Sequence, residues 1–174
     1  MNYTVLVEQT KTLWAELNVP LYKVEVTSLD DRSREYLRTV GFPEEAEPGL
    51  DFTDLTGNLF THTQLYTRDD FPALDQYLVI GATGDGNPVC IDSVGSSVVY
   101  IDHDNGFEAV FINSDLPSFN YCMAQYSRTC RAEGGLTLPG IKALELEIQK
   151  TDPRAIEEST FWTDAILQLE RIIE

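Results

Sequence analysis

Short runs of β-branched and aromatic residues, separated by turn residues, limit the topology of this chain more than any other feature. Five runs are bounded by Gly, Asp, Asn, Ser or Pro: NLFTH from Asn58, QYLVI from Gln76, PVCID from Pro88, SVVYID from Ser97 and EAVFIN from Glu108. The gaps between them are too short to hold the crossover helices that parallel strands require. The pattern therefore predicts an antiparallel meander of about five strands.

Helical patterns precede these runs. The first seventeen residues predict a helix around Leu6, Leu13, Trp14 and Leu17. A second helix is predicted in SLDDRSREYLRTVGFPEE, which starts at Ser28 and carries acidic residues in its first turn. It should end at the GFP turn, Gly41 to Pro43. The PLYKVEV segment between the two helices is too irregular to decide between strand and loop.

The last third of the chain predicts helices. One starts in NSDLPSFNYCMAQYSRTC, with Ser114 or Asp115 as its cap. GIKALELEIQK alternates as a strand does, but its Glu and Lys residues favour a helix, which we expect. In the tail, Asp152 should cap a helix that begins at Pro153. Its apolar stripe comprises Ile156, Trp162, Ile166, Leu169 and Ile173.

Together these patterns predict an α+β fold. We expect residues 1–174 to form a single domain, because domains commonly hold roughly 100 to 200 residues. Its largely antiparallel sheet should be flanked by N- and C-terminal helices. One core joining sheet and helices is predicted to contain Ile80, Ile91, Val99, Phe111, Phe119 and Trp162.

The charge of the chain limits its partners. Twenty-nine acidic residues against twelve basic ones give a formal net charge of −17 at pH 7. Such a field repels nucleic acids and anionic membranes and speeds encounter with basic proteins. Acidity that serves solubility alone is the other interpretation. Without an apolar run of about 20 residues or a leader-like N-terminus, we expect a soluble, cytoplasmic protein.

The glycine-rich run YLVIGATGDGNPVCID, from Tyr77, raises the question of a phosphate site. A phosphate loop leads into the N-terminus of a helix and usually carries a Lys. Here the glycines lead into a strand, Asp85 would face the phosphate, and no Lys or Arg occurs between Arg68 and Arg128. We therefore expect a hairpin turn at Asp85-Gly86 and no nucleotide or other cofactor.

Other ligand and catalytic patterns are incomplete. DHDNGFE, from Asp102, resembles a calcium loop, but Gly106 falls at its fifth position rather than the sixth, so a tight turn at Asn105-Gly106 is expected. His62 and His103 are predicted on separate strands and lack zinc spacing. We expect no metal site.

The cysteines do not indicate an enzyme or a disulfide framework. Cys90, Cys122 and Cys130 lack paired spacing and suit buried thiols. An enzyme using Cys90, His103 and Asp102 would need those side chains within hydrogen-bond reach. Strand alternation would instead point Asp102 and His103 to opposite faces. No catalytic residue is predicted.

From about Leu29 to the C-terminus the chain resembles the SUKH superfamily, which contains bacterial immunity proteins and fungal cell-wall synthesis regulators. The resemblance rests on the Gly41–Pro43 turn, on Ile80-Gly81 before a turn, on Asp92 ending a strand, on VVYID, and on FINSDLPSF leading into a helix. It implies an α+β fold without enzymatic activity. Residues 1–27 are a poorly matched N-terminal extension.

The bacterial members of this superfamily are cytosolic antidotes that bind toxins, often nucleases. The resemblance therefore implies a non-enzymatic immunity protein that neutralises a cognate toxin, and the charge suits a basic nuclease. The alternative is an acidic regulatory or scaffold module without a toxin partner. Candidate partner-binding residues are acids at the turns of the meander, which could also be solvated turn residues: Asp85, Asp102, Asp104 and Glu108.

Overall fold

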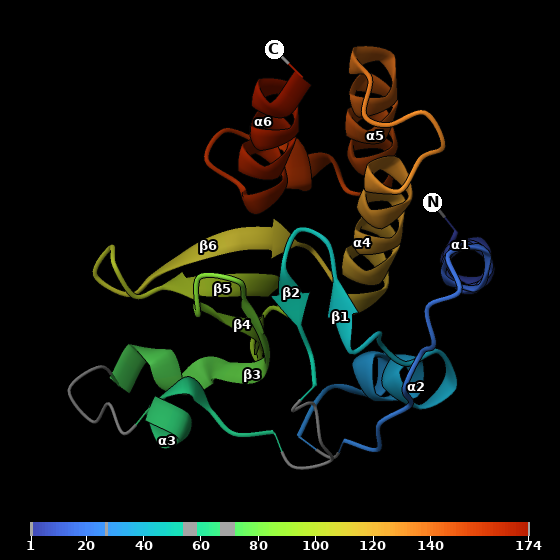
Figure 1. Cartoon of the computed structure of the whole chain (residues 1–174). Helices are drawn as coiled ribbons and strands as arrows, with labels where there is room; N and C mark the ends of the chain where they lie inside the picture. The colour runs from blue at the N-terminus through green and yellow to red at the C-terminus, as the bar shows by residue number, and fades with distance from the viewer. Residues whose placement is uncertain (1, 27, 54–58, 67–71, 174) are drawn as a thin grey trace.

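The computed structural model describes residues 2–26, 28–53, 59–66 and 72–173, and its centre is an antiparallel sheet (Figure 1). Six strands pair in chain order, each with the next. They are β1 (Glu45–Ala46), β2 (Leu50–Asp51), β3 (Tyr77–Thr83), β4 (Pro88–Asp92), β5 (Val98–Asp102) and β6 (Glu108–Asn113). The predicted meander and α+β class are confirmed.

Two details of the sheet differ from the prediction. NLFTH is not a strand: Thr61 makes an isolated bridge to Leu78, and α3 (His62–Tyr66) begins directly after it, while Asn58 lies outside the described residues. Gln64 accepts a hydrogen bond from the Thr61 amide at 3.0 Å, and such local bonds compete with strand pairing. The hairpin of β1 and β2 was not predicted, because two-residue strands have no apolar run to reveal them.

The glycine-rich run forms the expected turn between β3 and β4. The Gly86 amide donates to the Thr83 carbonyl at 2.8 Å, and Gly86 has a φ of 81°. At the turn between β5 and β6, Gly106 has a φ of 66° and the Phe107 amide donates to the Asp102 carbonyl at 2.9 Å. Both predicted turns are therefore confirmed, and neither leads into a helix.

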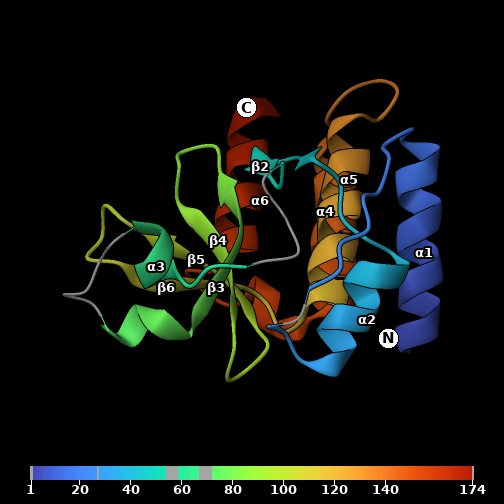
Figure 2. The same ribbon diagram turned by 90° about the horizontal axis from the view of Figure 1, so that it is seen from below.

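Helices cover both faces of the sheet (Figure 1). The longer ones are α1 (Tyr3–Glu16), α2 (Asp31–Thr39), α4 (Leu116–Cys130), α5 (Leu138–Thr151) and α6 (Phe161–Ile173), with 3₁₀ turns at η1 (Pro72–Gln76) and η2 (Pro153–Ile156). Seen from below, α4 lies between the sheet and α1 (Figure 2). Within the described residues, no helix has the length and apolar character needed to cross a bilayer.

Of the two predicted caps, the one at Asp115 is confirmed and the one at Asp152 is wrong, and the structure adds a cap at Asp30 that was not predicted. Asp30 caps α2 and Asp115 caps α4 through side-chain bonds to backbone amides. At the tail, Pro153 starts only the short η2, and α6 begins at Phe161. The chain turns between them because the Thr160 hydroxyl donates to the Ala155 carbonyl at 2.8 Å, which holds the segment folded back. Asp152 makes no capping bond there.

The main core lies between the sheet and the helices α1, α2, α4, α5 and α6, and it contains Ile80, Ile91, Phe119 and Trp162 as predicted. Val99 was assigned wrongly: it packs with Cys90, Ile101 and Leu74 in a second cluster on the other face of the sheet. Successive side chains of a strand point to opposite faces, so Val98 rather than Val99 faces the main core. Phe111 is only partly buried, packed against the main core beneath the Arg154 guanidinium.

Two glycines are required where the chain approaches itself closely. Gly41 has a φ of 87°, and a Cβ atom there would lie 2.3 Å from the Tyr22 carbonyl oxygen. A Cβ atom on Gly81 would lie 2.4 Å from the Asp51 carbonyl oxygen, at a register shift in β3. Both positions belong to the motifs that carry the superfamily resemblance, and both serve backbone packing.

We predict that Trp162→Ala lowers the free energy of unfolding by about 3 to 5 kcal/mol. Trp162 is fully buried, and its ring packs against that of Tyr126 in a tilted arrangement. Its Nε1 donates a hydrogen bond to the Asn113 side-chain oxygen at 2.8 Å. Chemical denaturation monitored by circular dichroism measures the change. Leu167→Ala, at a position of α6 that is 43% exposed, is the matched control. Equal midpoints for the two variants would contradict the core assignment.

Candidate functional site

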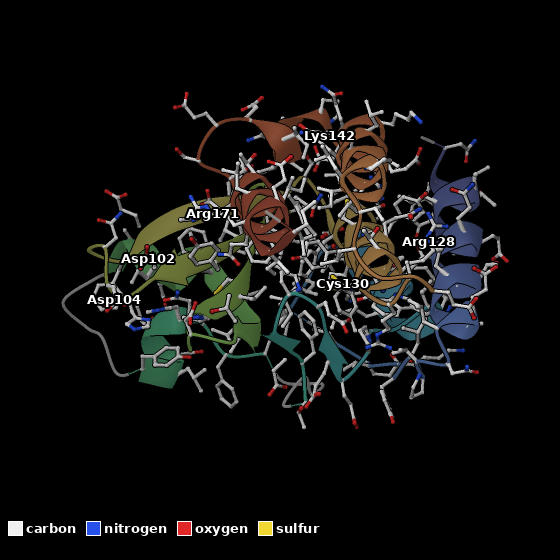
Figure 3. The ribbon with its side chains drawn as sticks, turned by 45° about the horizontal axis from the view of Figure 1, so that its top comes forward. Asp102, Asp104, Arg128, Cys130, Lys142 and Arg171 are labelled. Atoms are coloured by element: carbon white, nitrogen blue, oxygen red, sulfur yellow. The ribbon has the colours of Figure 1, made fainter. Side chains whose placement is uncertain are left out.

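The acids predicted to bind a partner lie at one end of the sheet. In a meander, alternate turns meet at the same end, so the β1–β2, β3–β4 and β5–β6 turns are neighbours; we call this the turn end. The His103 amide donates to the Asn87 side-chain oxygen at 3.1 Å, which ties the last two turns together. Figure 3 shows Asp102 and Asp104 at this end, away from Arg128 beside α1.

The structure gives the four predicted acids different local roles. Asp102 ends β5, and its carboxylate accepts hydrogen bonds from the amides of Asp104 and Asn105 at 3.0 and 3.2 Å. Glu108 begins β6 and accepts a bond from the Asn105 side chain at 3.1 Å. Both acids therefore stabilise the β5–β6 turn.

The carboxylates of the other two predicted acids, Asp85 and Asp104, are more exposed and do not hold a turn together. The Asp104 side chain is 89% exposed and lies 3.5 Å from the His103 ring. Asp85 is exposed in the β3–β4 turn and has no hydrogen bond or ion pair within the described residues. Asp85 and Asp104 are thus the two predicted acids whose carboxylates are most available to a partner.

A hollow of about 280 Å³ adjoins the β3–β4 turn, and sequence reasoning missed it. We call it the acidic hollow and define it by Asp85, Tyr100, Phe161 and Asp164, which line it together with Pro48 and Gln168 among others. The first turns of α6 form one side of it, and β5 and the turns form the other. No sequence signal links Asp85 to Asp164, because the fold alone brings α6 to this end.

Carboxylates make the electrostatic potential in the acidic hollow negative. Burial raises the pKa of Tyr100 above its usual value, and the charges of Asp102, Asp164 and Asp85 raise it further. The Tyr100 hydroxyl therefore stays protonated at neutral pH and can donate a hydrogen bond. Its ring meets that of Phe161 edge to face, with centroids 6.1 Å apart.

Elsewhere, most basic side chains are paired with acids of this chain. Arg38 binds Glu35 at 2.8 Å, and Lys142 bridges Glu145 and Glu170 at 3.1 and 2.8 Å. The Arg38–Glu35 contact lies within α2 and the Lys142–Glu145 contact within α5, and in both the paired residues are three positions apart in the sequence. Such pairs neutralise cations locally and leave the excess of carboxylates uncompensated, in particular at the turn end.

The cysteines of the described part of the chain are buried or half-buried thiols. Burial raises the pKa of Cys90 and Cys122 far above the usual thiol value and that of Cys130 to about 11, so all three remain thiols at neutral pH. Within the described ranges, no group of three or more His, Cys, Asp or Glu could hold a metal ion.

Both histidines were assigned to strands wrongly. His62 is the first residue of α3 and is buried, with its ring 4.9 Å from that of Tyr66 and 6.1 Å from that of Phe107. His103 lies in the β5–β6 turn, just beyond the end of β5 at Asp102. The predicted alternation of Asp102 and His103 along one strand therefore does not apply.

Comparison with known proteins identifies the family. Residues 12–168 match the SUKH-4 immunity protein family. Neither the curated proteins nor the solved structures yield a significant match. Because the matched region runs from within α1 to within α6 and so includes the whole sheet, the chain belongs to the SUKH-4 immunity protein family, within the SUKH superfamily.

Proposed function

We propose that this chain neutralises a cognate bacterial toxin by binding a basic surface of that toxin at the turn end of its sheet. Membership of an immunity family supports a toxin as the partner. The observation that carries the finer proposal is the group of uncompensated carboxylates at the turn end, formed by Asp85, Asp104 and Asp164 with Asp102 beside them.

A nuclease toxin suits this surface best. Nucleases bind phosphate backbones through Lys and Arg side chains, and an acidic protein competes for the same groups. The net charge of −17 adds long-range attraction toward such a partner. Binding alone suffices for this role, so the proposal includes no catalytic step and no cofactor. Action in the cytoplasm is a further part of the proposal.

The first test is association with the product of the gene adjacent to this chain's gene, taken as the candidate toxin domain. We expect rapid association at 0.01 M salt, where the Debye length is about 30 Å, and a marked decrease in the on-rate at 0.15 M, where it is about 8 Å. Surface plasmon resonance measures both rates. An on-rate that does not change with salt would contradict the electrostatic part of the proposal. Absence of any association would favour the scaffold alternative.

The second test neutralises the predicted acids together, as Asp85→Asn, Asp102→Asn, Asp104→Asn and Glu108→Gln. The amide at position 102 keeps an oxygen that can accept the two backbone bonds of the turn, so the fold should survive. We expect the on-rate at low salt to fall by at least about tenfold.

The matched control neutralises four exposed acids on α1, on α2 and in the segment between them: Glu8→Gln, Glu25→Gln, Asp31→Asn and Glu35→Gln. It changes the net charge by the same amount, so it separates a local effect from a global one. If the on-rate falls by the same factor in both quadruple variants, the turn end is not the binding surface.

Ligand independence is the third expectation. The glycine run forms a hairpin turn rather than a phosphate loop, so ATP, NAD, calcium and zinc should give no specific stabilisation. Thermal unfolding in the presence of each ligand measures this. A saturable rise of several degrees in Tm with any of them would overturn the expectation.

A further inference from the structure

The acidic hollow at the turn end combines carboxylates with aromatic rings. Its volume of about 280 Å³ is at the lower limit for small-molecule pockets, which begin at roughly 300 Å³. It has room for one long side chain rather than for a nucleotide or an extended cofactor. Its walls come from turns and from α6, so a protruding group of another protein can reach it from solvent.

The charge of this hollow selects a cation. Asp85 and Asp164 are exposed and make no ion pair in the parts of the chain that the structure describes. No Lys or Arg is among the described residues that line the hollow. A cation seated between these carboxylates would offset their mutual repulsion.

The chemistry of the walls favours guanidinium over other cations. The planar guanidinium stacks on aromatic faces and binds carboxylates through two parallel hydrogen bonds, whereas an ammonium acts as a hydrated point charge. Tyr100 and Phe161 supply rings, and Asp85 of the β3–β4 turn and Asp164 of α6 supply carboxylates. Gln168 adds a further side-chain oxygen.

We propose that the acidic hollow receives an arginine side chain of the toxin, which pairs with Asp85 and Asp164 against the rings of Tyr100 and Phe161. This inference rests on the proposed function, because it assumes a basic protein partner. It adds α6, through Phe161 and Asp164, to a binding surface that otherwise consists of turns.

The direct test needs no toxin. ¹⁵N-labelled protein is titrated with Nα-acetyl-arginine amide, and backbone amide shifts are followed by NMR. We expect weak, saturable shifts confined to the β3–β4 turn, to β5 near Tyr100 and to the start of α6. Nα-acetyl-lysine amide should bind more weakly, and uncharged Nα-acetyl-citrulline amide should give no saturable shift. Equal binding of citrulline, or no shift with arginine, would overturn the inference.

A charge-matched pair of variants locates the effect. Asp164→Asn should weaken binding of the arginine probe about tenfold, the typical scale of a lost charge-assisted pair. Asp104→Asn removes the same charge at the same end of the sheet but outside the hollow, and it should leave the affinity within about twofold. Thermal unfolding of both variants verifies that they fold. Equal losses of affinity would show that charge at this end, rather than the hollow, attracts the probe.

The same pair of variants, tested with the toxin domain, separates this inference from the proposed function. We expect Asp164→Asn to raise the off-rate and Asp104→Asn to change mainly the on-rate. If the toxin binds both variants with unchanged off-rates, the inference fails while the proposed function stands. If the toxin does not bind the unaltered protein, the proposed function fails, and the arginine titration still decides whether the hollow binds a cation.

Discussion

Buried hydrogen bonds from the two tryptophans to asparagine side chains join the helices of this protein to each other and to the sheet. Trp14 of α1 donates to Asn120 of α4 at 2.7 Å, and the Asn120 amide donates to the Gly41 carbonyl at 2.9 Å. Because unpaired buried amides cost on the order of 1 to 3 kcal/mol, this pairing fixes α1 and the Gly41 turn against α4.

The second tryptophan repeats the arrangement at the end of β6. Trp162 of α6 donates to Asn113 at 2.8 Å, and the Asn113 amide donates to the Asp152 carboxylate at 3.1 Å. Asp152 also accepts from the Ser114 amide at 2.6 Å. The start of α6 is thereby held at the sheet, and this position brings Phe161 and Asp164 to the acidic hollow. The position of the proposed binding surface thus depends on a hydrogen-bond network that is itself buried.

The residues that carry the superfamily resemblance have structural roles. Gly41 and Gly81 allow close backbone contacts, and Asp92 ends β4 and accepts a bond from the Val94 amide at 2.9 Å. None of these three residues lines the acidic hollow, whereas Tyr100 of the VVYID strand does. In this chain Gly41, Gly81 and Asp92 therefore determine how the backbone packs, while the VVYID strand also contributes Tyr100 to the acidic hollow.

Local patterns in the sequence were enough to predict β3 to β6, their two glycine turns and the main helices. Apolar alternation, turn residues and capping residues act over a few neighbouring positions, and they also mark Asp85 and Asp104 as exposed. Only the structure showed that NLFTH gives way to α3, that Val99 lies outside the main core, and that α6 begins at Phe161 beside Tyr100. The position of Val99 and the approach of α6 to Tyr100 depend on contacts between residues far apart in the chain, which leave no periodic signal. The starts of α3 and α6 depend also on single side-chain hydrogen bonds between nearby residues, which apolar periodicity does not reveal.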